Sequence, residues 1–194
     1  MNAITQIITQ QLGGSAARTI AQRFGISEST ANTAVQIGVP LILAALARNA
    51  SQPQEAQNIH QAVSTQHDGS IFDNLTGYLQ NPQTANGAGI LGHVFGNQRP
   101  AIESNLAQAT GMDQSSAGGL LETLAPLVMG SLGKAQQQNG LDASGLSDFL
   151  NNQQQEAQTT APGAMSMLSS LLDQNKDGSS MDDLQRMAAS FFKR

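Results

Sequence analysis

The residues best suited to chemistry lie near the C-terminal end of the sequence, where acidic and amide side chains alternate as they do in a calcium-binding loop. Calcium takes several oxygen ligands, and side chains at loop positions 1, 3 and 5 with glycine at position 6 let the chain fold around one ion. Asp173, Asn175 and Asp177 stand at those positions, and Gly178 follows. The pattern predicts a calcium site whose candidate ligands are Asp173, Asn175, Asp177, Ser179, Asp182 and Asp183.

This loop departs from a complete EF-hand at its closing position. Position 12 usually carries a bidentate Glu, but Leu184 stands there, and Asp182 and Asp183 come one or two residues early. A shortened loop would hold the ion as a structural clip, with these two aspartates competing for the closing role. The alternative is that no ion binds, because Ser179 or Ser180 followed three residues later by an acidic residue also forms a capped helix start.

An earlier copy of this motif occurs in the chain without the additional ligands. Residues 68–70 repeat the Asp-Gly-Ser of the predicted calcium loop, but Ser64 and Gln66 replace its first two ligands. Helix capping alone therefore explains what the two copies share, and only the additional oxygen ligands of the later copy argue for calcium.

A second pattern, over residues 20–30, is similar to the helix-turn-helix of many transcription regulators. A DNA-reading helix needs cationic or amide side chains that reach base edges and phosphates. Neither residues 27–47 nor their later counterpart, residues 115–133, contain Lys or Arg. We favour a structural helix pair, with DNA binding as the alternative function. That alternative requires an exposed basic face assembled from Arg18, Arg23, Arg48 and Arg99.

Gly87, Gly89 and Gly92 have the spacing of a dinucleotide-binding loop. That site needs a strand before the glycines, within a strand-helix-strand unit, whereas the residues preceding them, 81–86, are typical of a turn. We expect these glycines to connect two parts of the chain and to allow close helix packing.

Three histidines are the remaining candidates for acid–base chemistry. None has a partner at metal-ligand spacing, and the sequence lacks a Gly-x-Ser-x-Gly nucleophile elbow. We expect His60 and His67 to be solvated or capping residues, and His93 to be a buried imidazole that ties two helices by hydrogen bonds. An enzyme would need a deep pocket holding His93 beside a carboxylate, and we predict that the protein is not an enzyme.

An internal repeat predicts the helices and turns that must position these side chains. Residues 25–31 recur at residues 111–117, and Pro40-Leu41 recurs as Pro126-Leu127, with the same offset of 86 residues. Each copy is typical of a helix, a glycine turn and a second helix. The same offset relates Ile4 and Ile8 to Ile90 and Val94.

Local chemistry explains the matched positions. Gly25 and Gly111 suit the left-handed residue that ends a helix, and Ser27 and Asp113 are good N-caps for the next one. The second helix of each copy contains a proline inside an apolar run, which predicts a kinked, central helix. The residues whose helical spacing predicts buried faces are Ala17, Ile20, Ala21, Phe24, Ile102, Leu106 and Ala109.

The Asp-Gly-Ser motif repeats at a larger offset, 109 residues, so the second copy holds about 23 additional residues. They fall around residues 137–160, where we expect exposed polar runs, 136–139 and 151–155, to flank one extra helix. The chain then divides into a first helical repeat, residues 1–86, and a second, residues 87–194. The extra helix carries Leu146, Phe149 and Leu150.

Composition limits the possible functions of this 194-residue chain. It has no cysteine, which excludes disulfides and thiolate chemistry, and its net charge of −5 with scattered Lys and Arg argues against nucleic-acid binding. The longest apolar run, residues 37–47, is too short to span a bilayer. Residues 1–12 do not resemble a signal peptide, so we expect a cytoplasmic protein. No stretch alternates with period two, which predicts an all-α fold of about ten helices.

Three segments resemble the YidB-like bacterial family, of DUF937 type, which is catalogued only as a domain of unknown function. They are residues 89–96, residues 111–126 and the terminal Asp-Gly-Ser motif at 177–184. The resemblance covers most of the chain and implies a multihelical fold. It implies no activity, because patterns of small and apolar residues identify a fold better than a function. The leading hypothesis is a non-enzymatic helical binding or scaffold protein whose partner is another protein, with calcium as its candidate ion.

Overall fold

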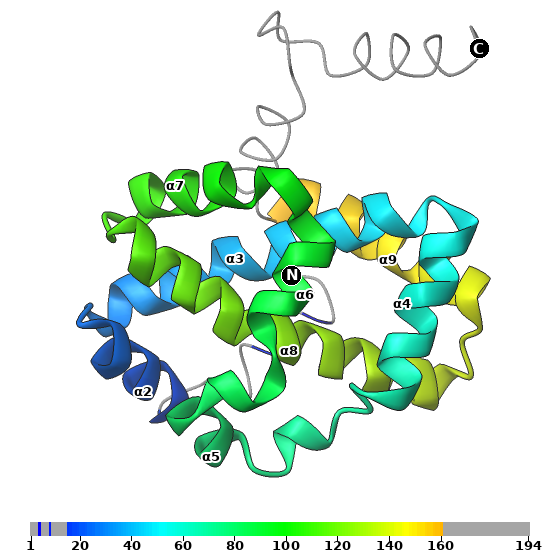
Figure 1. Cartoon of the computed structure of the whole chain (residues 1–194), viewed down its shortest axis with the longest axis horizontal. Coiled ribbons are helices and arrows are strands. Elements are labelled where there is room, and N and C mark those ends of the chain that lie inside the picture. Colours follow the sequence, from blue (N-terminus) through cyan, green and yellow to red (C-terminus); the bar gives the residue numbers. More distant parts are fainter. Residues whose placement is uncertain (1–3, 5–7, 9–14, 161–194) are drawn as a thin grey trace, which may run out of the picture.

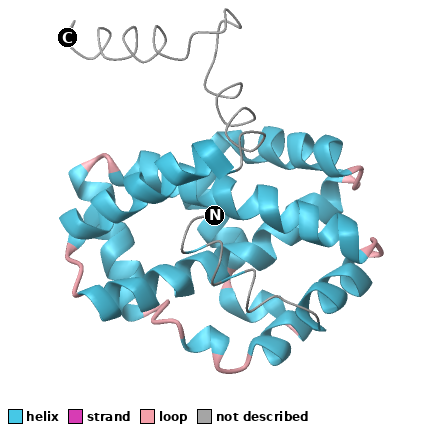
Figure 2. Ribbon diagram, turned by 180° about the vertical axis from the view of Figure 1, so that it is seen from behind, coloured by secondary structure: helices cyan, strands magenta, loops and turns pink. Residues whose placement is uncertain are grey.

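Two long helices, α3 (Glu28–Ala50) and α8 (Gln114–Asn139), run through the centre of the molecule, and shorter helices surround them (Figure 1). The computed structural model describes Ile4, Ile8 and residues 15–160. No strand occurs among these residues (Figure 2), so the all-α prediction is confirmed. The other elements are α2 (Ser15–Phe24), α4 (Pro53–Thr65), η1 (Ser70–Phe72), α5 (Leu75–Gln80), η2 (Pro82–Ala85), α6 (Gly87–Phe95), η3 (Gly96–Gln98), α7 (Arg99–Thr110) and α9 (Ala143–Thr160).

The turns that precede the two long helices form as their residue types predict. Gly25 and Gly111 take positive φ angles of 64° and 71°, a conformation that glycine adopts without strain. Ser27 then caps α3 by accepting from the Thr30 amide at 3.0 Å, and Asp113 caps α8 in the same way. These local predictions are confirmed, whereas the duplication of the whole unit stays a prediction.

The central helices are enclosed because they are apolar on every side. All residues from Gly38 to Ala47 and from Thr123 to Gly133 are buried, and a helix that is hydrophobic all round belongs in a core. Gly38 lets the two helices come close, since a Cβ there would stand 3.0 Å from Leu124 Cδ1. Pro40 and Pro126 lie inside these helices, and a kink at either proline stays a prediction.

By length and composition, α3 is also a helix that could cross a membrane. Of its most apolar stretch, 72% is buried inside the protein, and the core helix of a soluble protein has the same character. The expectation that no helix of this chain spans a membrane therefore stays a prediction. It is based on the apolar run at residues 37–47, which is shorter than α3 as a whole.

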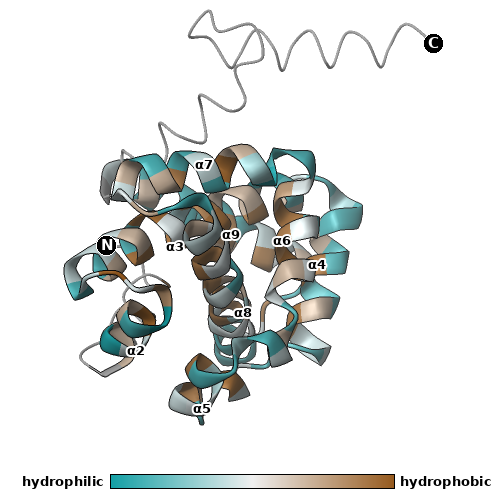
Figure 3. Ribbon diagram, turned by 60° about the vertical axis from the view of Figure 1, so that its left-hand side comes forward, coloured by the Kyte–Doolittle hydropathy of each residue, from teal (hydrophilic) through white to brown (hydrophobic). Residues whose placement is uncertain are grey.

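The surrounding helices pack against this centre with their apolar faces (Figure 3). The first half of the chain and the second contribute to one hydrophobic core, and α9 packs against α3 while α4 packs against both α8 and α9. The proposed division between residues 86 and 87 falls at the N-cap of α6, and it stays a prediction.

Two expectations about helix faces are wrong. The polar run at 151–155 lies inside α9 rather than at its end, and Gln153 is buried, with its Oε1 accepting from the Ile4 amide at 3.3 Å. Ala109 is exposed on α7, where Ala107 is buried instead. In both cases the elements packed against the helix determine which of its faces is buried. The predicted helix with Leu146 and Leu150 is confirmed as α9.

Glycines on α8 and α6 let backbone segments touch directly. A Cβ at Gly133 would overlap the His67 carbonyl oxygen, and one at Gly87 would overlap the Glu122 carbonyl oxygen. Gly130 instead makes room for a side chain, since a Cβ there would stand 2.8 Å from Ile71 Cγ2. The loop after α4 and the start of α6 are therefore held against α8 with no side chain between them.

We predict that Gly133→Ala destabilises the protein by about 1–3 kcal/mol, because the new methyl group must displace the loop that carries His67. Gly92→Ala is the matched control: it is a helical glycine whose Cβ would meet no atom within 4 Å, and we expect it to stabilise by about 0.5–1 kcal/mol. Urea unfolding of both variants measures the difference. Equal stabilisation by the two substitutions would contradict the contact.

Candidate binding groove

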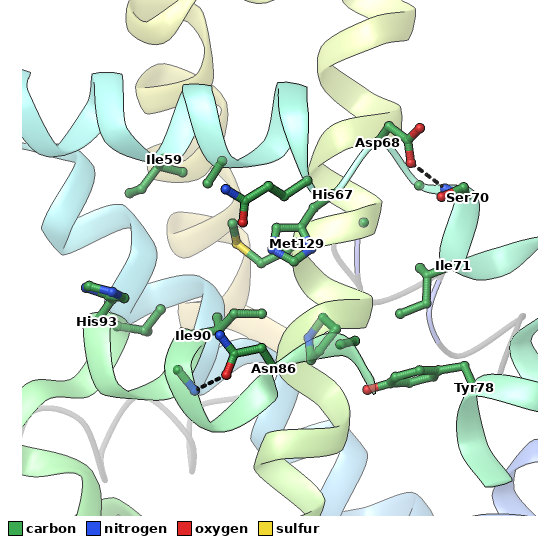
Figure 4. Close-up of a pocket in the computed structure, with 18 of the residues that line it drawn as sticks. Ile59, His67, Asp68, Ser70, Ile71, Tyr78, Asn86, Ile90, His93 and Met129 are labelled. Carbon is green, nitrogen blue, oxygen red and sulfur yellow. Dashed lines mark hydrogen bonds between the residues drawn. The ribbon is translucent and has the colours of Figure 1, made fainter. Parts of the chain in front are cut away.

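A cavity of about 1160 Å³ opens between α4 on one side and α5 and α6 on the other (Figure 4). The middle of α8 forms its floor with Pro126, Met129 and Gly130, and the end of α3 contributes Leu46 and Asn49. Pockets of this kind are the usual place for ligand binding in a fold of packed helices. We refer to this cavity as the α4–α6 groove.

One continuous face of α4 lines the groove along its whole length. Glu55, Asn58, Ile59, Ala62 and Gln66 line it, and their spacing of three and four residues places them on one side of a helix. The adjoining face of α4, with Ala56, Ile59 and Val63, packs into the core, and Ile59 belongs to both faces. The groove is therefore elongated along this helix.

The facing wall is made of two short helices that begin in the same way. Asn74 caps α5 and Asn86 caps α6, with their Oδ1 atoms accepting from Gly77 N at 3.1 Å and Gly89 N at 3.3 Å. A Cβ on either glycine would collide with the amide group of its asparagine. Within the described part of the chain, the Nδ2 groups of both asparagines donate to no residue, so they are free to donate into the groove.

These contacts explain the Gly-x-Gly-x-x-Gly pattern. Gly87 touches the α8 backbone and Gly89 leaves room for the Asn86 cap, as expected of glycines that allow close packing, while Gly92 is exposed. The strand that a dinucleotide site requires is absent here, because a 3-10 turn, η2, precedes α6.

Tyr78 anchors the α5 wall to the floor. Its hydroxyl donates to the Thr123 carbonyl of α8 at 2.7 Å, one turn before Pro126. The side chain is 8% exposed, and burial raises the pKa of its hydroxyl well above the usual value. Tyr78 is therefore a neutral donor whose hydrogen bond is already used.

The loop after α4 closes one end of the groove. Asp68 accepts from the Ser70 amide at 3.0 Å, and the hydrogen bonds from Ser70 lower the pKa of its carboxyl group. His67 is half-buried, and burial lowers the pKa of its imidazole, against the opposing effect of Asp68. His67 is therefore neutral at pH 7, beside an ionised carboxylate.

The other two histidines differ from expectation. His93 lines the groove but is exposed, so the prediction of a buried imidazole is wrong; Val94 and Phe95 take the buried positions of this turn. His60 is half-buried rather than solvated, and its Nε2 lies 3.2 Å from both the Leu141 carbonyl oxygen and Gln136 Nε2. Because Gln136 lies in the last turn of α8 and Leu141 in the connection to α9, His60 has a structural role.

The structure does not describe the predicted metal ligands. Asp173, Asn175, Asp177, Ser179, Asp182 and Asp183 all lie outside the described residues. Among residues 15–160, no group of three His, Asp or Glu side chains is placed to hold a metal ion.

The arginines that a DNA-binding face would need have other contacts. Arg18 forms an exposed ion pair with Glu28 at 3.0 Å, and Arg48 donates to Gln98 Oε1 at 2.9 Å. Arg23 stands 5.9 Å from the centre of the Phe24 ring. Arg99 pairs with Glu103 at 2.6 Å and with Glu122, which joins α7 to α8. Arg18 and Arg23 lie on α2, Arg48 lies on α3 and Arg99 lies on α7.

Sequence reasoning missed the groove. Its carboxamides come from four helices, so no linear motif contains them. One local signal was present: Asn74 and Asn86 each stand three residues before a glycine, the spacing of an N-cap whose side chain covers a helical position without a Cβ.

The fold and the groove define an all-α protein whose described residues contain no metal-binding cluster. The model of a family described as a bacterial protein of unknown function, DUF937, matches residues 6–136. This span is more than half of the chain, so the protein belongs to that family, and the resemblance seen in the sequence is confirmed. Comparison with curated proteins and with solved structures gave no match.

We predict that the protein loses stability as the pH falls below about 6.5, the ordinary pKa of histidine, because His67 resists protonation when folded. The unfolded chain then binds more protons than the folded one, so the free energy of unfolding decreases with falling pH. His67→Gln removes this contribution. Urea unfolding between about pH 7.5 and pH 5.5 should give a shallower pH dependence for the variant; an unchanged slope would contradict the assignment.

Proposed function

We propose that the protein is a non-enzymatic helical binding protein and that the α4–α6 groove is its binding site. The observation that carries this proposal is the pairing of unused amide donors, on Asn74 and Asn86, with an apolar floor that includes Met129. Binding sites combine apolar surface with a few directed polar groups in this way.

The chemistry of the groove supports binding rather than catalysis. The Tyr78 hydroxyl is already bonded to Thr123, and its raised pKa keeps it protonated at neutral pH, so it cannot serve as a base there. Among the described histidines, none forms an ion pair with a carboxylate. The hydrogen bonds of histidine rings in the described residues are those of His60, to Leu141 and Gln136, so the lining offers no histidine bonded to a hydroxyl nucleophile of the kind that covalent catalysis uses.

A neutral, environment-sensitive dye tests whether the groove is accessible. We expect Nile red to bind one site per wild-type chain with a fluorescence increase, and Ala62→Phe to weaken binding at least about tenfold, because a large side chain on the lining face of α4 fills the cavity.

Gln61→Phe is the matched control for this experiment, since Gln61 is exposed on the same helix and does not line the groove. It should bind the dye as the wild type does. Failure of the wild type to bind, or equal binding by both variants, would contradict the groove as a binding site.

We further propose that the C-terminal loop binds one calcium ion as a structural clip. Support comes from the sequence alone: Asp173, Asn175 and Asp177 provide oxygen ligands at alternating positions before Gly178. The first copy, with Ser64 and Gln66 at the equivalent positions, lacks these ligands.

Calorimetric titration of the metal-stripped full chain should give saturable binding of about one calcium ion. We expect Asp173→Ala and Asp177→Ala to abolish it, because each removes an oxygen ligand. Asp68→Ala, which changes the corresponding residue of the first copy, should leave it intact. No heat up to about millimolar calcium would mean that this loop is only a capped turn.

A further inference from the structure

We propose that the α4–α6 groove takes an extended peptide with a basic residue near each end. This inference rests on the proposed function and names the ligand class of the same groove. It follows from the shape of the groove, from its carboxamide groups and from its charge.

The length of the groove suits a short peptide. The lining face runs along the 13 residues of α4, which gives a length of about 20 Å at 1.5 Å per residue and matches about six residues of extended chain. The polar groups of the walls then favour an extended chain over a helix.

The polar groups of the walls suit a peptide backbone. An extended chain leaves its own N–H and C=O groups unpaired, whereas a helix pairs them internally. Carboxamides offer both a donor and an acceptor, and exposed ones line both walls of the groove. They are Asn58 on α4, Gln66 directly after it, and Asn74, Asn81 and Asn86 at the ends of α5 and α6.

The floor suits alternate side chains of the same peptide. Successive side chains of an extended chain point in opposite directions, so every second one faces the floor. Met129 on the floor, with Ile59, Ile71 and Ile90 on elements beside it, lines the groove and provides apolar contact for such side chains.

The charge of the groove selects basic residues at the ends. Glu55 lies in the first turn of α4, and Asp68 lies three residues beyond its last residue, so a carboxylate stands at each end. No Lys or Arg is among the described residues that line the groove, and His67 has a lowered pKa. A peptide with acidic ends would meet like charges at both positions.

Three synthetic heptapeptide mixtures test this. Each has Leu, Ile, Val or Met at positions 2, 4 and 6 and Ser at positions 3 and 5; the first has Lys at both ends, the second has Glu there, and the third repeats the first with N-methylated backbone amides. Binding is followed by the emission of Tyr78, because the chain has one tyrosine and no tryptophan. The peptides contain neither residue.

We expect saturable binding of the Lys peptides, and binding about tenfold weaker for the Glu and the N-methylated peptides, which lose the end charges or the backbone donors. Glu55→Gln should weaken the Lys peptides about threefold, whereas Asp148→Asn, which removes an exposed charge on α9 outside the groove, should not.

Equal binding of the Lys and Glu peptides, or undiminished binding of the N-methylated ones, would overturn the proposal, as would no Tyr78 response to any peptide. Nile red separates the two levels of inference. If the dye binds the wild type and is lost in Ala62→Phe while no peptide binds, the groove remains a binding site and only the peptide assignment fails.

Discussion

The groove exists because two backbone segments approach α8 without intervening side chains. Gly133 admits the carbonyl group of His67, and Gly87 lies against the carbonyl group of Glu122. These two contacts fix the loop after α4 and the start of α6, which are the end and one wall of the cavity. A methyl group at either glycine would displace one of these segments. The shape of the cavity therefore depends on the lack of a Cβ atom at Gly133 and Gly87.

The rest of the core provides the rigid support for these contacts. The enclosed segments of α3 and α8 are almost entirely aliphatic, and the close approach at Gly38 interlocks them. On the outside, Arg99 joins α7 to α8 through Glu103 and Glu122, and His60 joins α4 to the connection before α9. Polar contacts thus hold the outer helices in position, whereas burial of aliphatic surface supplies most of the stabilisation.

The walls and the floor of the groove have different chemistry for a structural reason. Short helices have a large proportion of unpaired end groups, and α5 and α6 satisfy theirs with Asn74 and Asn86. Each capping amide uses its oxygen for the helix and keeps its nitrogen for the groove. Helix capping and the proposed ligand binding therefore use opposite ends of one side chain, and the caps place carboxamides where short helices begin.

The sequence by itself determined the helical class, the glycine turns and the caps at Ser27 and Asp113, because these depend on neighbouring residues and on the period of the helix. It also determined the family, through short local motifs. Tertiary structure alone decided that Gln153 is buried, that His93 is exposed and that carboxamides from separate helices line one groove. These outcomes depend on which faces meet across the core, and no local spacing encodes that arrangement.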